Sequence, residues 1–220
     1  MKARPFFHDA VPAQAPQSLH FRMMNGHQAK RRRIALASTS PQRRAILRQL
    51  GIPFVVLAPR YEEKDTKDPV EMVRAHARGK ARSVLREARG RPVLGVDTTV
   101  VLDGGVYGKP ETEEEARQML TALAGRTHLV ISGLCLVTPE WEELGHEVTR
   151  VVFRVLLPRE VEAYVRTGEW RGRAGGYAIQ GRGAALVERI EGDYLNVVGL
   201  PAALLVRILA HRFPGVYGYG

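Results

Sequence analysis

Seven charged side chains in this chain of 220 residues are of the types that suit a phosphate-bearing substrate. The four basic ones and the three acidic ones are Arg43, Lys80, Lys109 and Arg173, and Glu62, Glu63 and Asp97. Carboxylates opposite phosphates imply a hard divalent cation, because Mg²⁺ is commonly held by one or two carboxylates together with substrate oxygens and water. Such a set suits hydrolysis at phosphorus, in which basic groups stabilise a leaving pyrophosphate and a carboxylate orients or deprotonates the attacking water.

The residue patterns of several other chemistries are missing. No spacing of cysteine and histidine suits zinc, no G-x-S-x-G elbow marks a serine hydrolase, and no G-x-G-x-x-G follows a strand. The glycine-flanked Lys109 is not in a P-loop, because Asp103 stands where the first glycine would be and Pro110 replaces the serine or threonine. The seven histidines are scattered, and none is singled out as a candidate.

Arg43 belongs to the segment Ile34–Leu47, which has the pattern of a strand, a polar turn and the start of a helix. Ser40 is expected to cap this helix, and Pro41 fits its first position, where a missing N–H costs nothing. Arg43 and Arg44 in the first turn oppose the helix dipole unless an anion lies in front of them. The segment therefore predicts a phosphate site, and an ordinary capped helix with two solvated arginines is the alternative.

Lys80 lies on the apolar face of a second predicted helix, which Asp68 caps and Pro69 opens. At helical spacing this face also carries Val73, Ala77 and Val84. The lysine could extend along its stem to water, or its ammonium could point into a polar cleft that holds an anion. The helical pattern by itself leaves both possibilities open.

Asp97 interrupts the strongest predicted strand, the apolar run Pro92–Leu102, which has the composition of a central strand. A carboxylate buried there needs a partner, a metal or a catalytic reason. Lys109 follows in a glycine-flanked turn, from which it could reach a phosphate. Arg173 lies within residues 171–183, whose five glycines predict a loop that closes on a ligand rather than an RGG-type RNA-binding tract.

The remaining patterns complete a mixed α/β chain without internal repeats. Further helices are expected over residues 112–124, 158–167 and 200–211. Further strands are expected over residues 53–57, 128–137, 147–157, 184–190 and 195–198, the last as the return strand of a hairpin.

Composition and charge restrict the class of protein. A single cysteine, Cys135, allows no intramolecular disulfide, and no apolar run approaches the ~20 residues of a membrane span, so a reducing, cytoplasmic setting is expected. The net charge is +10, but residues 1–33 hold seven basic side chains and one acidic one. This proline-punctuated stretch is expected to be a disordered, solvated extension, followed by a single domain over residues 34–220. Nucleic-acid binding through the extension is the less favoured interpretation.

Eight short motifs occur in order between residue 34 and about residue 209. They are Leu36-Ala37-Ser38-Thr39-Ser40-Pro41 with Arg43, Glu62-Glu63, Lys80-Ala81, Gly95-Val96-Asp97-Thr98, Gly108-Lys109-Pro110, Gly125-Arg126-Thr127-His128, Ala174-Gly175-Gly176-Tyr177-Ala178-Ile179-Gln180-Gly181, and Val198-Gly199-Leu200-Pro201. Together they resemble the Maf family of nucleoside triphosphate pyrophosphatases, also called septum formation inhibitors.

The resemblance implies a Maf/ITPase-like α/β fold, in which helices flank a mixed twisted β-sheet and a nucleotide cleft lies between two lobes. It also implies a cytoplasmic homodimer that hydrolyses nucleoside triphosphates to monophosphate and pyrophosphate with Mg²⁺ or Mn²⁺, as a house-cleaning enzyme. A regulatory protein of cell division, which binds nucleotide only as a ligand, is the alternative from another class.

Site residues are carried over by motif position. The resemblance assigns the proton acceptor to Asp97 and further catalytic groups to Lys80 and Lys109. It assigns substrate contacts to Ser38, Ser40, Arg43 and Arg173, and metal or water contacts to Glu62, Glu63 and Asp97.

Base preference follows the subfamily. Thr98 and Gln180 match the branch that acts on dTTP and UTP, and not the branch that acts on 7-methyl-GTP. Two departures stand out: Gln42 replaces an arginine of the dTTP/UTP branch, and Arg173 replaces a lysine, which keeps the charge but alters its geometry. The resemblance therefore predicts dTTP and UTP as substrates, with Gln42 leaving the alternative preference for 7-methyl-GTP open.

Overall fold

The computed structural model describes residues 33–64 and 66–219. The extension expected over residues 1–33 lies outside the described residues, apart from Arg33. The strands are β1 (Ile34–Ala37), β2 (Phe54–Leu57), β3 (Val93–Leu102), β4 (Gly105–Tyr107), β5 (Thr127–Val137), β6 (Glu142–Phe153) and β7 (Val187–Glu191). The helices are α1 (Pro41–Gln49), α2 (Pro69–Ser83), α3 (Glu113–Leu123), α4 (Pro158–Val165), α5 (Tyr194–Val198) and α6 (Ala202–Arg212), with two 3-10 turns, η2 (Ala174–Gly176) and η3 (Arg182–Leu186).

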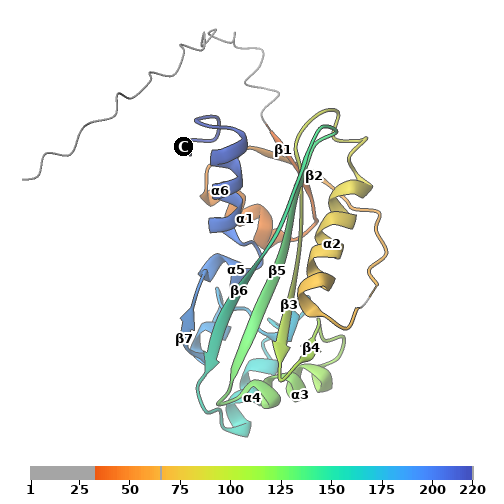
Figure 1. Ribbon diagram of the computed structural model, residues 1–220. Coiled ribbons are helices and arrows are strands. Elements are labelled where there is room, and N and C mark those ends of the chain that lie inside the picture. Colours follow the sequence, from red (N-terminus) through yellow and green to blue (C-terminus); the bar gives the residue numbers. More distant parts are fainter. Residues whose placement is uncertain (1–32, 65, 220) are drawn as a thin grey trace, which may run out of the picture.

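The strands form one open, mixed sheet of seven strands in the order β2-β1-β3-β5-β6-β7, with β4 paired to β3. β1 runs parallel to β2 and β3, whereas β3, β5, β6 and β7 pair in antiparallel fashion. The long strands β3, β5 and β6 extend along the whole molecule (Figure 1). The α/β fold expected for the Maf family is confirmed.

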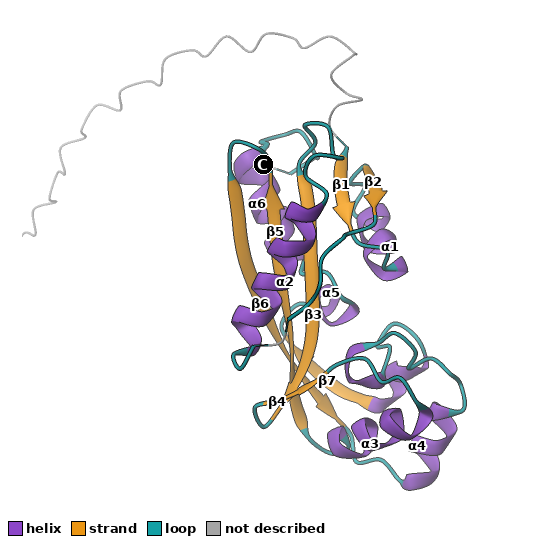
Figure 2. Cartoon of the chain, turned by 90° about the vertical axis from the view of Figure 1, so that its right-hand side faces the viewer, coloured by secondary structure: helices purple, strands orange, loops and turns teal. Residues whose placement is uncertain are grey.

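The helices divide the molecule into two lobes at opposite ends of the long strands. α1 and α6 lie at one end and α3 and α4 at the other (Figure 2). Each lobe has its own apolar core: one is built around Leu36, Leu47 and Leu205, the other around Leu120 and Phe153. Because β3 and β5 contribute to both cores, a side chain at the middle of β3 can face both lobes at once.

Helix α2 packs unusually close to the sheet. Gly95 on β3 and Gly133 on β5 lie beneath it, and a Cβ atom at either position would collide with the helix backbone, at the carbonyl oxygens of Ala77 and Val73 respectively. Since these two glycines lack side chains, the helix axis can approach the strands, and side chains on its inner face reach the middle of β3.

Two element predictions are wrong, and the strand expected over residues 184–190 begins only at Val187, because the residues before it form the 3-10 turn η3. Leu195–Val198 belongs to helix α5 and is not a return strand, because Asp193 caps the segment by accepting the Leu195 N–H at 2.8 Å. β6 begins at Glu142 instead of residue 147, because it pairs with β5 along its full length as one long hairpin. Long-range pairing overrides the polar start of the strand in this case. None of the described helices is long and apolar enough to cross a membrane.

Candidate active site

A pocket of about 400 Å³ lies beside the middle of β3. Its walls come from the β1–α1 turn, β3, the glycine-rich segment that begins at Arg171, and α5. Five basic side chains and two carboxylates line it. Such an excess of positive charge in a concave site favours an anionic ligand.

The β1–α1 turn forms one corner of this pocket. Ser40 caps α1 as expected, its Oγ accepting the Arg43 N–H at 3.5 Å. The Arg43 guanidinium turns back across the turn and donates to Ser38 Oγ at 3.1 Å, Thr98 Oγ1 at 3.3 Å and the Gly199 carbonyl at 2.9 Å. Burial lowers the pKa of Arg43, and the nearby carboxylates of Asp97 and Glu63 oppose that effect. Arg43 is therefore a fixed cation that joins three segments of the site.

Asp97 and Lys80 form a nearly buried ion pair at the centre of the pocket. Nζ of Lys80 donates to Oδ1 of Asp97 at 2.5 Å and lies 2.6 Å from Oε1 of Glu63. Burial raises the pKa of Asp97, but Lys80, Arg43 and His76 together outweigh burial and hold this pKa below its usual value. Of the two possibilities for Lys80, the structure shows the ammonium pointing into the polar cleft.

His76 is the residue at this centre that the sequence did not single out. The residue is 2% exposed, with Nδ1 3.1 Å from Oδ2 of Asp97 and Nε2 3.0 Å from the Lys64 carbonyl oxygen. A signal was available, because position 76 is four residues before Lys80 and therefore on the same helical face. A histidine on an otherwise apolar face, next to a lysine, could have been selected on that ground.

The loop before α2 is held against the helix along its length. The Arg60 N–H donates to Ser83 Oγ at 3.1 Å, and the Lys64 carbonyl accepts from His76. Between these two contacts the Tyr61 ring lies against Gly79, where a Cβ atom would collide with it. We call residues 60–64 the strap. The strap presents Glu63 to Lys80 and Asp97.

The pocket brings together all but one of the site residues expected from the sequence. Those that line it are Ser38, Ser40, Gln42, Arg43, Glu63, Lys80, Asp97, Thr98, Lys109, Arg173 and Gln180. Glu62 does not line the pocket, so Glu63 is the carboxylate that the strap delivers. Nε of Arg173 is buried without a hydrogen-bond partner among the described residues.

Comparison with known proteins identifies the family. The family model described as Maf-like protein matches residues 33–212. The chain belongs to this Maf-like family. Its relatives include the dTTP/UTP pyrophosphatase of Symbiobacterium thermophilum, which is 48% identical over 80% of this chain and 92% of the relative. The dTTP/UTP pyrophosphatases of Deinococcus radiodurans and Moorella thermoacetica are 43% and 47% identical, over 86% and 84% of this chain and 96% and 98% of their own lengths.

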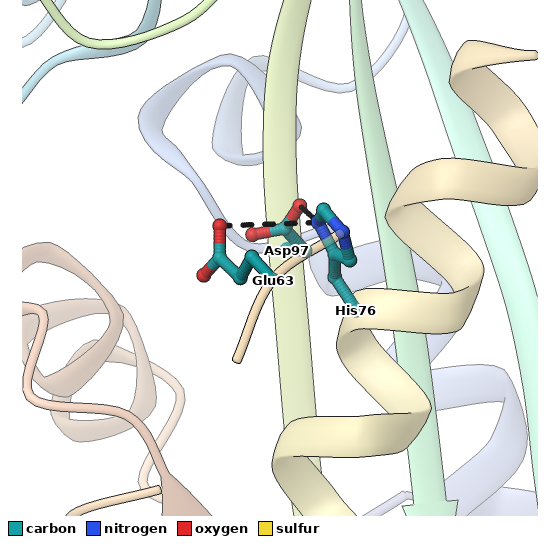
Figure 3. A group of neighbouring side chains, drawn as sticks. All are labelled: Glu63, His76 and Asp97. Carbon is teal, nitrogen blue, oxygen red and sulfur yellow. Dashed lines mark hydrogen bonds and ion pairs between the residues drawn. The ribbon is translucent and has the colours of Figure 1, made fainter. Parts of the chain in front are cut away.

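The Maf-like site includes a group of side chains that could hold a metal ion. Glu63, His76 and Asp97 each offer one ligand atom, and these atoms lie within 4.8 Å of one another. The three side chains come from the strap, α2 and β3 and point toward one another (Figure 3). Two carboxylates and an imidazole are a plausible donor set for a divalent cation, so the residues fit the cation that the Maf resemblance implies.

Proposed function

We propose that this Maf-like protein hydrolyses dTTP and UTP to the nucleoside monophosphate and diphosphate. The observation that best supports this proposal is that the Asp97–Lys80 ion pair and several basic side chains line the same pocket. The dTTP/UTP pyrophosphatases at 42–48% identity support the choice of reaction and substrate.

In this proposal the triphosphate lies across the pocket between its two walls. The hydroxyls of Ser38 and Ser40 and the guanidinium of Arg43 bind phosphate oxygens at the N-terminus of α1, where backbone N–H groups and the helix dipole favour an anion. Lys109 and Arg173 approach from the other lobe. Binding from both sides fixes the triphosphate chain and stabilises the charge on the leaving diphosphate.

Asp97 positions the attacking water. Because its pKa is held low, the carboxylate is ionised at neutral pH and accepts a hydrogen bond from the water. The water oxygen forms a bond to phosphorus while the bridging P–O bond to the diphosphate breaks, and the water proton passes to Asp97 or to solvent. Lys80 keeps Asp97 in place and is close enough to contact the same phosphate. A divalent cation held by the carboxylates of Glu63 and Asp97 would supply charge neutralisation at phosphate when bound.

The base is selected by the polar side chains at the edge of the pocket. Gln42 and Gln180 line both this pocket and a neighbouring hollow of about 330 Å³. Oε1 of Gln42 accepts the Ser40 hydroxyl at 3.0 Å, which leaves the amide nitrogen of Gln42 free to donate to a base carbonyl. Thr98 is already engaged by Arg43 and Ser132, so it acts on selectivity through Arg43.

The test is diphosphate release from dTTP, UTP, 5-methyl-UTP, CTP, GTP and 7-methyl-GTP, with Mg²⁺ or Mn²⁺. We expect dTTP and UTP to have the highest kcat/KM, and Asp97→Asn to lower it by at least about a thousandfold. Hydrolysis led by 7-methyl-GTP would reject the substrate assignment. Absence of turnover by folded protein with metal would favour the nucleotide-binding regulator instead. A cytoplasmic homodimer remains part of the proposal, and sedimentation of the purified chain tests the dimer.

A further inference from the structure

The hydrogen-bonding pattern of His76 determines which of its two nitrogens carries a hydrogen. Nε2 lies 3.0 Å from the Lys64 carbonyl oxygen. A carbonyl oxygen can only accept a hydrogen bond, so Nε2 must be the donor. In the neutral ring the remaining nitrogen, Nδ1, then has a lone pair and no hydrogen.

This Nδ1 atom faces carboxylate oxygens. It lies 3.1 Å from Oδ2 of Asp97 and 3.9 Å from Oε2 of Glu63. The other oxygen of each carboxylate, Oδ1 and Oε1, contacts the Lys80 ammonium. Three electron-pair donors therefore converge on the side away from Lys80. A nitrogen lone pair and a carboxylate oxygen 3.1 Å apart repel each other unless a positive species lies between them, and a metal ion is such a species.

The surroundings of His76 are those of a metal ligand. Ligating histidines almost always donate their second N–H to a carboxylate, a backbone carbonyl or water, which fixes the ring orientation, and the strap supplies such a carbonyl at Lys64. His76 is 2% exposed, and its ring meets the Tyr61 ring edge-on, with 5.9 Å between the two ring centroids. His76 is consequently held in one orientation before any cation arrives.

We propose that Nδ1 of His76 is a ligand of the divalent cation, and that it makes this centre prefer a first-row transition ion over Mg²⁺. Mg²⁺ favours oxygen ligands in near-ideal octahedral geometry and dehydrates reluctantly. An imidazole nitrogen suits first-row transition ions better than it suits Mg²⁺. This inference deepens the proposed function, since it concerns the cation of the same site.

The test uses Mn²⁺ alone, added to the full-length protein without nucleotide, and pulsed electron paramagnetic resonance to detect nitrogen bound to manganese. The wild type should show the ¹⁴N modulation of a directly bound imidazole. His76→Gln should lose it, because the glutamine amide can still donate to the Lys64 carbonyl but offers no nitrogen lone pair at the Nδ1 position. His146→Gln, which removes an exposed histidine on β6, is the matched control and should keep it.

Affinity gives a second readout. Loss of outer-shell partners of ligating histidines costs about 10- to 100-fold in metal affinity, so His76→Gln should weaken Mn²⁺ binding at least about tenfold and lower the Mn²⁺-to-Mg²⁺ preference. Wild type that binds no Mn²⁺, or binds it without ¹⁴N modulation, would overturn the proposal. A ¹⁴N modulation that survives in His76→Gln would also overturn the proposal. These spectra do not depend on turnover, so a failure of the proposed dTTP/UTP hydrolysis would be seen separately, in the diphosphate assay.

Discussion

Nζ of Lys80 lies 2.5 Å from Oδ1 of Asp97, and the two side chains are 11% and 13% exposed. A lysine on helix α2 and an aspartate on strand β3 thus form one nearly buried ion pair that also contacts Glu63. Removing one partner of such a pair leaves the other charge desolvated and unpaired, so each residue needs the other to offset the free-energy cost of its own buried charge.

Lys80→Met should therefore abolish most of the activity. Methionine keeps the apolar stem but leaves Asp97 and Glu63 without their cation, and we expect kcat/KM for dTTP to fall about a hundredfold to a thousandfold. Arg82→Met, on the same helix but exposed and paired with Glu142, is the control and should retain activity. Loss of activity in both variants would indicate damage to α2 and not to the site.

Arg43 and its neighbour Arg44 should behave differently. Arg43 donates to Ser38, Thr98 and the Gly199 carbonyl, whereas Arg44 does not line the pocket. Hydrogen bonds to charged groups contribute about 1.5–3 kcal/mol each, so Arg43→Ala should lower kcat/KM on the order of 10- to 100-fold, and Arg44→Ala should change it little. Steady-state kinetics with dTTP measure both. Equal effects would contradict the phosphate role of Arg43.

Gln180 should influence base preference more than rate. It lines both the main pocket and the neighbouring hollow, and Gln180→Glu replaces an amide that can donate with a carboxylate that can only accept. We expect the kcat/KM ratio of dTTP to 7-methyl-GTP to fall by at least about tenfold, the usual cost of one mismatched polar contact. Competition between the two triphosphates in one reaction measures this ratio, and an unchanged ratio would exclude Gln180 from base contact.

A substitution at Gly79 tests whether the strap must hold Glu63 in place for activity. Alanine at this position should raise helix propensity by about 1 kcal/mol, but its Cβ atom would displace the Tyr61 ring and with it Glu63. Gly79→Ala should consequently lower kcat/KM without lowering the melting temperature. In a Tyr61→Ala background the same substitution should have little further effect, since the obstructing ring is gone. Additive losses in the double variant would show that Gly79 acts by another route.

His128 should make stability depend on pH. It is 1% exposed, shares a 2.9 Å hydrogen bond between Nε2 and the Tyr177 hydroxyl, and burial lowers its pKa from 6.5 to about 4. The unfolded chain therefore binds a proton between pH 6.5 and 4 that the folded protein does not, so the free energy of unfolding is unaffected above this window and decreases as the pH falls through it. The loss should be on the order of 3 kcal/mol.

Denaturant titrations at several pH values measure this contribution as the difference between wild type and His128→Gln, whose amide can still pair with Tyr177. The difference should shrink as the pH falls from 6.5 towards 4. His146→Gln, at an exposed position, should follow the wild type. A pH-independent difference would mean that His128 has the same pKa in the folded and the unfolded chain.

Local sequence signals predicted most of the elements that position the site. Ser40 with Pro41 and Asp68 with Pro69 begin α1 and α2 as expected, because a capping side chain and a proline at the first position act within one turn. The prediction of a strand over Leu195–Val198 was wrong, because β-branched and apolar residues suit a strand and a short helix alike. Only the Asp193 cap, together with the absence of a pairing strand among residues 33–64 and 66–219, decides between them.

Local patterns along the chain were enough to recognise the family, the central strand with Asp97, the helix face that carries Lys80, and the basic residues expected at phosphate. Three features became visible only in the folded chain: Glu63 and not Glu62 lines the pocket, Lys80 pairs with Asp97, and His76 also contacts Asp97. The reason is that these contacts join the strap, α2 and β3, and depend on how closely the helix approaches Gly95 and Gly133. Helical spacing places two side chains on one face, but it does not say what that face meets.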